Sequence, residues 1–430
     1  MPRLSFLIII FSLLSASSGP LGLSLVHAQE VQNEKPEKPK TRRSQVLGKN
    51  AFRLIERSQE LLAEEKYDEA MAVLKTILEG QTFNSYEKAV AIQTSGYIHF
   101  GKEDYGSAIG AFESAITTGD LPPRVVSDLT YGLAQLYLAK ERPRKSLELM
   151  EKWFAAQEKE PGGEPFALKA QIHLILDELR SAEQAIKKAL SKEEEPKQQW
   201  TRILLSVLLQ EERYSETLPI LEQAVQIWPG VKVFWEQLVA IYYHFEEEDL
   251  AFVARRAMHV QGMLVSTREL SSMAQLYLYH DVPIKAADIL QTGMDSNRIE
   301  KTEKNYELLA RAYMQAREWN KAIAPLTRAA EMSDEGKFYA QLAQSHIQEE
   351  KWGLAENALV EALNKGGLDD EADNWLLLGI ARTRLEKYDA AIRAFRKAGD
   401  DDDVAKDAFR WIRSIERRLA ENRRAAADQK

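Results

Sequence analysis

The sequence predicts an all-α fold built from a repeated pair of helices. Residues 305–330 (NYELLARAYMQAREWNKAIAPLTRAA) hold two successive stretches that are apolar at helical spacing, and residues 374–398 repeat the pattern. A small residue lies inside each stretch, Ala310 in the first and Ala322 in the second. Two antiparallel helices approach closely only where small side chains meet, so these residues mark a predicted crossing of two helices.

The small residue of the second helix recurs along the chain at intervals of 33 to 38 residues. Its successive copies are Ala70, Ala108, Ser146, Ala182, Thr217, Ala251, Ala286, Ala322, Ala355 and Ala391. One hairpin cannot bury its own apolar face, so the copies must stack on each other. We therefore expect ten hairpins over residues 51–399. The sixth copy deviates most, because Arg255 and Met258 stand where Leu and Ala are usual.

This repeat resembles the tetratricopeptide repeat (TPR) family, and the resemblance covers about residues 51–398. It implies a TPR solenoid, a right-handed superhelix of about ten helix-turn-helix repeats. In such a solenoid the first helices of the hairpins line the concave face.

The ends of the chain differ from the repeats. Residues 1–28 are predicted to be a signal peptide, with a basic start, an uncharged apolar core and Ala28 before the cleavage site. The alternative is an uncleaved membrane anchor, but Gly19 and Pro20 interrupt the apolar run before it reaches about 20 residues. We therefore expect a periplasmic chain without stable membrane insertion after cleavage. Residues 29–50 form a basic, Pro- and Lys-rich linker, taken as a spacer.

Residues 400–430 are predicted to be a capping helix and a tail. Four acidic residues, 400–403, precede an apolar stripe at helical spacing. The stripe consists of Val404, Ala408, Trp411, Ile415 and Leu419. A helix with one apolar face is what the open end of a stacked array requires. The alternative is that its basic face binds anionic lipid or an acidic partner.

Composition and motifs give no case for catalysis. The chain has no cysteine, which excludes a lipoprotein, disulfides and thiol chemistry, and its net charge of −9 gives no case for nucleic acid. It lacks a phosphate-binding glycine loop and an HExxH motif. We interpret His99, His173 and His346 as packing residues, and expect His244, His259 and His280 to lie in different repeats. We therefore predict a chain that is not an enzyme and needs no cofactor or metal.

A binding surface is indicated by the residue that follows the small residue of each first helix. It is glutamine in five of the ten copies. An amide both donates and accepts hydrogen bonds, so a row of amides can hold the backbone of an extended peptide. The predicted peptide-binding residues are Gln135, Gln171, Gln275, Tyr279, Arg311 and Gln344. The alternative is a merely polar groove in which glutamine was chosen as a good helix former.

A narrower resemblance lies in residues 228–398. The strings WPGVKVFWEQL, TRELSSMAQLYLYHDVPIKAADIL, RAAEMSDEGKFYAQLAQ and EALNKGGLDDEADNWLLLG are similar to the secreted periplasmic TPR protein associated with TonB–ExbB–ExbD systems. The resemblance implies an accessory of TonB-dependent outer-membrane transport that binds TonB, ExbB or ExbD, and it transfers no site residues. A general scaffold for envelope assembly or secretion and a non-catalytic subunit of an envelope enzyme complex remain as alternatives.

Overall fold

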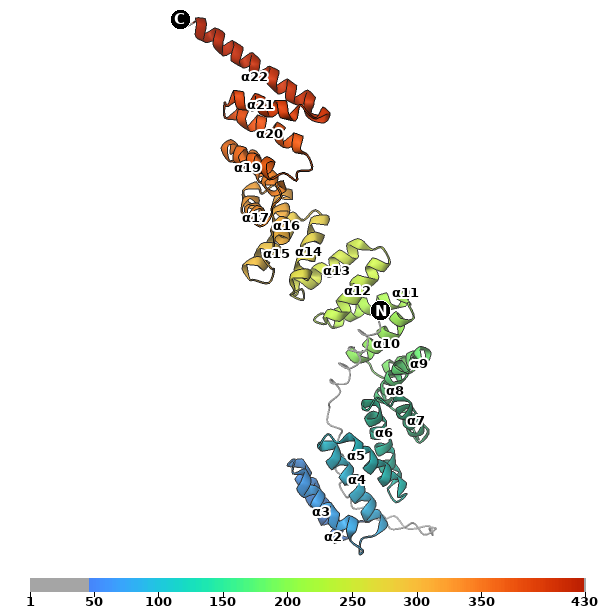
Figure 1. Cartoon of the computed structure of the whole chain (residues 1–430). Coiled ribbons are helices and arrows are strands. Elements are labelled where there is room, and N and C mark those ends of the chain that lie inside the picture. Colours follow the sequence, from blue (N-terminus) through green and yellow to red (C-terminus); the bar gives the residue numbers. More distant parts are fainter. Residues whose placement is uncertain (1–45, 429–430) are drawn as a thin grey trace. The chain divides into compact units, whose positions relative to one another are not determined.

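The computed structural model describes the main chain of residues 46–428 and the side chains of residues 46–424. The predicted signal peptide and most of the linker lie outside the described residues. All the regular structure within them is helical, and the helices follow one another as antiparallel pairs (Figure 1). The five pairs of the N-terminal half are α2 (Lys49–Ala63) with α3 (Tyr67–Glu79), α4 (Ser85–Gly101) with α5 (Tyr105–Thr117), α6 (Pro123–Ala139) with α7 (Pro143–Ala155), α8 (Gly163–Ile175) with α9 (Leu179–Leu190), and α10 (Gln198–Gln210) with α11 (Tyr214–Ile227).

Five further pairs follow, and a last single helix. They are α12 (Lys232–His244) with α13 (Glu248–Val260), α14 (Thr267–Tyr279) with α15 (Pro283–Asp295), α16 (Glu303–Gln315) with α17 (Trp319–Met332), α18 (Lys337–Gln348) with α19 (Trp352–Lys365), α20 (Glu371–Arg384) with α21 (Tyr388–Ala398), and α22 (Asp402–Asp428). The ten predicted hairpins and the predicted capping helix are therefore confirmed.

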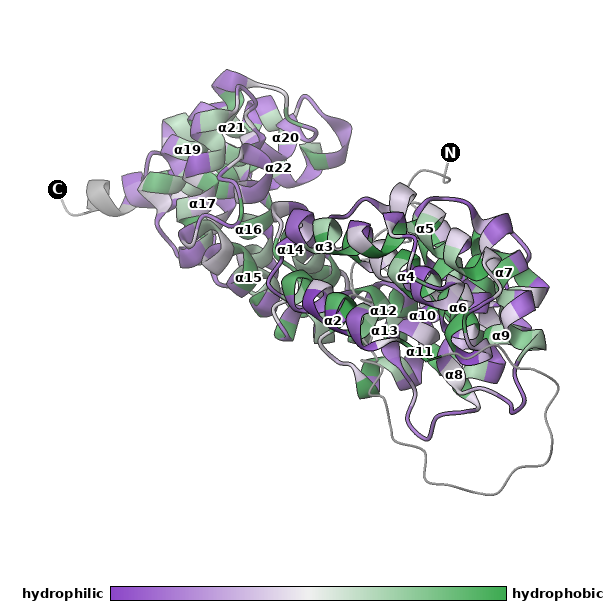
Figure 2. Cartoon of the chain, turned by 90° about the horizontal axis from the view of Figure 1, so that it is seen from below, coloured by the Kyte–Doolittle hydropathy of each residue, from purple (hydrophilic) through white to green (hydrophobic). Residues whose placement is uncertain are grey.

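The predicted helix crossings are confirmed residue by residue. Each of the ten small residues of the second helices is the fourth residue of its helix and has no exposed surface. The backbones approach so closely that a Cβ atom added at Gly96 would lie 2.4 Å from the ring of Phe112. At Gly379 the same atom would lie 2.5 Å from the ring of Phe395. Hydrophobic and hydrophilic residues alternate around the helices, as stacking of amphipathic hairpins requires (Figure 2).

The turn inside every hairpin has the same backbone geometry. Its second-last residue adopts a left-handed conformation, with φ between +54° and +62°. The ten residues are Glu65, Glu103, Glu141, Asp177, Glu212, Glu246, Asp281, Arg317, Glu350 and Glu386. The next N–H then reaches back over the end of the first helix, as Lys66 N does to Leu61 O at 2.8 Å. This hydrogen bond closes the helix end in the manner of a Schellman motif, although none of the ten residues is glycine.

The chain forms two compact units, Met1–Trp228 and Pro229–Lys430. The described part of the first unit holds α2 to α11, and one of its apolar clusters contains Leu133, Met150 and Ile172. The second unit holds α12 to α22, and one of its clusters contains Leu326, Phe338 and Leu359. Each unit therefore has its own buried core.

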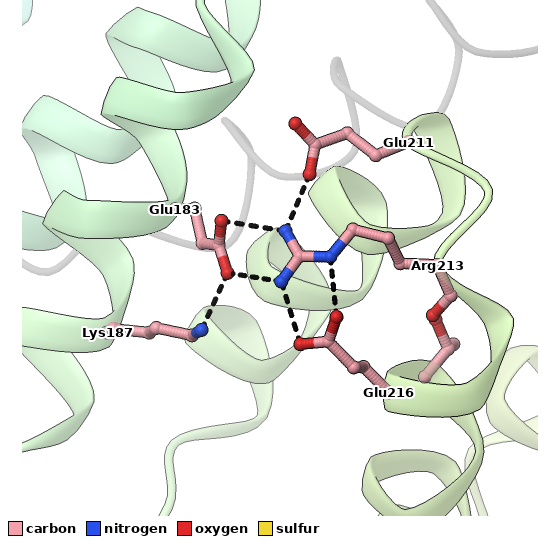
Figure 3. A network of polar contacts seen from close by, with 6 residues as sticks. Glu183, Lys187, Glu211, Arg213 and Glu216 are labelled. Atoms are coloured by element: carbon pink, nitrogen blue, oxygen red, sulfur yellow. Dashed lines mark hydrogen bonds and ion pairs between the residues drawn. The ribbon is translucent and has the colours of Figure 1, made fainter.

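A charged network joins the fourth and fifth hairpins within the first unit (Figure 3). Arg213, which precedes α11, donates two hydrogen bonds to the carboxylate of Glu183 in α9, at 2.8 and 2.9 Å. Glu216 and Glu211 bind the same guanidinium at 2.7 Å, and Lys187 binds Glu183 at 2.6 Å. The hydrogen bond from Arg213, followed by that from Lys187, lowers the pKa of Glu183 to about 2.

An equivalent contact joins the ninth and tenth hairpins in the second unit. Glu356 follows the buried Ala355 as Glu183 follows Ala182. Its carboxylate binds Lys387, the residue before α21, at 2.5 Å and Arg382 at 3.0 Å. Two hairpin interfaces are therefore held by a carboxylate at the same repeat position.

The terminal helix α22 covers the apolar face of the last hairpin. Ala408, Ile412 and Ile415 are buried against α20 and α21. The indole of Trp411 stacks on the ring of Phe395 with the ring centres 5.8 Å apart. Within the described residues, no helix is both long enough and apolar enough to span a bilayer.

Candidate functional site

The predicted peptide-binding residues lie at equivalent places on successive first helices. Five of them directly follow a fully buried alanine, and we call these five the first-helix row: Gln135, Gln171, Gln275, Arg311 and Gln344. Gln135 on α6 and Gln171 on α8 belong to the first unit and are half-buried. The other three, on α14, α16 and α18, belong to the second unit and are exposed.

The three members of the row in the second unit are open for binding. Among the described residues, the side chains of Gln275, Arg311 and Gln344 have no hydrogen-bond or ion-pair partner. Gln135 in the first unit differs, because its Oε1 atom is buried without a hydrogen-bond partner in the described structure. Two amides and a guanidinium thus stand on successive first helices of one unit, where they can donate to the carbonyl groups of an extended segment.

Tyr279, the sixth predicted residue, has a different environment. It lies one helical turn after Gln275 and is 72% exposed. Its hydroxyl donates to Glu248 Oε2 at 3.2 Å, and the negative charge of Glu248 raises the pKa of Tyr279. The equivalent residue of the next hairpin, Gln315, donates to Leu278 O at 3.2 Å and Asp281 Oδ1 at 3.1 Å. This second position therefore supplies contacts between successive hairpins.

Two of the three histidines predicted to be packing residues are buried, whereas His99 is partly exposed and its Nδ1 lies 3.5 Å from Asp104 Oδ2. His173 and His346 are buried on first helices, and His173 Nδ1 lies 2.6 Å from Glu178 Oε2, as expected of packing residues. The expectation that His244 and His259 lie in different repeats is wrong, because α12 and α13 form one hairpin. His244 ends the first helix and His259 lies on the second helix of the copy marked by Ala251, so both residues belong to the sixth hairpin. No cluster of three or more potential metal ligands occurs in residues 46–428.

A second feature, a cavity beside the sixth hairpin, does not follow from the sequence pattern. It lies between α13, α14 and α15 and has a volume of about 640 Å³. Its lining includes Phe252 and His259, which follow from the helical pattern only as packing residues. The one signal in the sequence was the irregularity of the sixth copy at Arg255 and Met258.

The tetratricopeptide repeat family model matches residues 340–405, which run from α18 into α22. No curated protein matches the sequence.

Several solved structures are similar. A tetratricopeptide repeat protein from Parabacteroides merdae is 15% identical, with a TM-score of 0.39, over 69% of this chain and 99% of that one. YrrB, described as a TPR protein with an unusual peptide-binding site, is 19% identical, with a TM-score of 0.36, over 44% of this chain and 91% of its own. MamA is 17% identical, with a TM-score of 0.33, over 38% of this chain and 94% of its own. Residues 340–405 thus match the tetratricopeptide repeat model, and helical hairpins follow one another throughout the described residues.

Proposed function

We propose that the chain is a non-catalytic scaffold that binds segments of other proteins along the first-helix row. The observation that carries the proposal is the exposure of Gln275, Arg311 and Gln344 and their lack of partners. All three are exposed and lack a partner among the described residues, while the alanines beside them are fully buried. The hairpin core thus fixes the backbone beneath polar groups that the fold itself leaves unused.

The binding should be modest in strength. An extended segment loses conformational entropy when it becomes ordered on the row, and this loss offsets part of the interaction energy. Hydrogen bonds from amides to a peptide backbone also replace hydrogen bonds to water, so each contributes only about 0.5–1.5 kcal/mol. A transient partner suits such a surface better than a permanent subunit.

We further propose that the scaffold works in the periplasm as an accessory of a TonB-dependent transport system. The support is the similarity of residues 228–398 to the secreted TPR protein associated with TonB–ExbB–ExbD systems, together with the sequence pattern of an exported chain in residues 1–28. The partner is then a periplasmic segment of TonB, ExbB or ExbD.

Site-specific crosslinking in intact cells tests the partner and the surface together. A photoreactive residue at position 275 or 311 is expected to crosslink to TonB, ExbB or ExbD. The same residue at position 357 is the control, because Asn357 is exposed on a second helix, α19. Crosslinks only to assembly or secretion proteins would overturn the TonB role and leave the general scaffold. Equal crosslinking from position 357 would show that the row is the wrong surface.

Export is tested separately by sequencing the N-terminus of the protein purified from the periplasmic fraction. We expect the mature chain to begin at Gln29. Recovery of the intact N-terminus with the membrane fraction would support the uncleaved anchor instead.

A further inference from the structure

The cavity between α13, α14 and α15 has an apolar floor. The floor residues are Phe252, Leu264, Leu270, Tyr277 and Ile289, each at most 9% exposed. They come from all three helices and from the loop between α13 and α14. A volume of about 640 Å³ is within the range of sites that accept organic ligands, about 300–1,000 Å³. The floor therefore offers a place for a large apolar group.

The rim of the same cavity is positively charged. Arg256, Lys285 and Arg298 line it and are exposed. Arg256 forms no ion pair with any described residue, and the guanidinium of Arg298 donates only to the neutral Ser296 Oγ, at 3.1 Å. Lys285 Nζ lies 4.0 Å from Asp288 Oδ2, the one carboxylate among the lining residues. Three cations thus face one acid, and the rim has an excess of positive charge.

The excess of positive charge at the rim also affects His259, which lines the same cavity. Burial lowers the pKa of its imidazole, and the charges of Arg298 and Lys285 lower it further. Its Nδ1 lies 3.4 Å from the hydroxyl of Tyr277. The histidine thus lies between the apolar floor and the basic rim, where a carboxylate would relieve the repulsion.

The contact that joins the fourth hairpin to the fifth and the ninth to the tenth is not made beside the cavity, where the corresponding residue is apolar, as it is in most of the hairpins. Phe252 follows the buried Ala251, and this is the position held by Glu183 in the fourth hairpin and by Glu356 in the ninth. Those carboxylates bind cations of the following hairpin. The ring of Phe252 instead stacks on His280, with the ring centres 4.0 Å apart. The cations beside it remain without such a carboxylate.

Exposed apolar side chains also occur on α13 and α15, two of the helices that line the cavity. Val260, which lines the cavity, is 77% exposed, and Val253 on the same helix is 55% exposed. Leu250 and Ile284 are 44% and 50% exposed. Val260 thus adds an exposed apolar side chain to the lining, and the other three lie on the same two helices. A ligand that uses them must be longer than one that only fills the cavity.

We propose that this cavity binds a segment of a partner protein in which a large apolar side chain is flanked by aspartate or glutamate. The apolar side chain enters the floor, and the flanking carboxylates pair with Arg256, Lys285 and Arg298. The adjoining backbone and further apolar residues lie over Val253 and Val260. This site is built from α13, α14 and α15 and uses none of the first-helix row, so it extends the scaffold role to a second surface.

A display library of random linear peptides, selected on the full-length protein, tests the proposal. We expect the enriched peptides to carry Asp or Glu next to Leu, Ile, Val, Phe or Trp. Their affinity, measured by fluorescence anisotropy, should fall at least tenfold in the double variant Arg256→Ala/Arg298→Ala. The control variant Arg268→Ala removes a charge from an exposed residue of α14 outside the lining and should leave the affinity unchanged.

A second readout uses the absence of cysteine from the chain. Thr292→Cys places a single thiol in the lining, and Gln344→Cys places one on the first-helix row. A selected peptide should slow alkylation of the first thiol by a neutral maleimide and not of the second. Protection of the second thiol alone would assign the peptide to the row, which would support the proposed function and overturn this site.

Three further results would overturn the proposal. They are the absence of any enriched peptide, enrichment of peptides without acidic residues, and equal binding to the double variant. Octanoate and phenylacetate provide a small-molecule arm, and saturation by either at the affinity of the peptide would indicate a small carboxylate ligand. Vesicles with anionic lipid provide a membrane arm, and binding to them that is lost in the double variant would indicate a lipid surface.

Discussion

Ser146 on α7 donates a hydrogen bond from its hydroxyl to the carbonyl oxygen of Ala134 on α6, at 2.6 Å. Both residues have no exposed surface. The first hairpin has the reverse arrangement, in which Ser58 Oγ on the first helix donates to Ala70 O on the second, at 3.0 Å. The backbones of paired helices therefore come within reach of a single small side chain, and the crossing leaves no room for a larger one.

Enlarging a residue at a crossing should destabilise the array. Ala322 is fully buried in α17, so Ala322→Phe should cost about 1–3 kcal/mol through overpacking. Chemical denaturation followed by circular dichroism measures the loss. Ala324→Phe on the exposed side of the same helix is the matched control and should leave the midpoint nearly unchanged. Equal midpoints for the two variants would contradict the packing described here.

Acid should weaken the contact between the fourth and fifth hairpins. Arg213 holds the pKa of Glu183 at about 2, below its usual value near 4.5. A lowered pKa in the folded state means that the stabilisation is complete above about pH 4.5 and is lost as the pH falls toward 2. At pH 7, Glu183→Gln should cost about 2 kcal/mol, as expected for a charged hydrogen-bonded group.

The pH dependence provides the control for that prediction. The difference between Glu183→Gln and the parent protein should shrink steadily below pH 4.5 in denaturation experiments. Glu148→Gln removes a carboxylate whose lysine partners lie on its own helix. It should therefore lower the free energy of unfolding less than Glu183→Gln does. A difference for Glu183→Gln that stays constant down to pH 2.5 would mean that lost packing, and not lost charge, explains the effect.

Glycine should stabilise a hairpin turn. Glu103 has φ +60° and a side chain exposed to solvent, and a residue with a Cβ atom is strained in this conformation. Glu103→Gly should therefore raise the free energy of unfolding by about 1 kcal/mol. The same substitution at the exposed Lys75, inside α3, should lower it by a similar amount. Thermal melting distinguishes the two signs, and a loss of stability at Glu103 would show that its side chain contributes more than the strain costs.

Removal of the terminal helix should cause self-association. Phe395, Ala391 and Ala398 are fully buried against α22, and truncation after Asp400 would expose part of this surface. Light scattering is expected to show a larger mean size than for the full chain. Ile415→Asp places a charge in the same contact and should likewise increase self-association. A truncated chain that stays monomeric and equally stable would argue that α22 is a free functional tail.

The repeat register could be predicted because it depends on single residues at fixed spacing. A residue such as Ala182 or Thr217 marks its crossing whatever surrounds it, and both are fully buried. The division after Trp228 could not be predicted, because the repeat spacing continues across it.

The candidate sites could likewise be predicted only in part from the sequence. The position of Gln275 beside a buried alanine follows from the repeat, as does the exposure of Arg311. The partner of Tyr279 did not follow, because Glu248 precedes it by 31 residues and lies in another hairpin. The cavity beside Phe252 needs the distance between two helices as well as their sequences. Residue pattern thus predicts which face a side chain occupies, whereas a cavity depends on how far apart the backbones lie.

The division of the chain into two units has a consequence for affinity. Gln135 and Gln171 belong to one unit, whereas Gln275, Arg311 and Gln344 belong to the other. If both sets bind, a partner with two binding segments gains affinity when the linker between its segments spans the two sets, because the second contact then forms within one complex. Two weak contacts can in this way give long residence, and release of either one is enough to make the complex short-lived again.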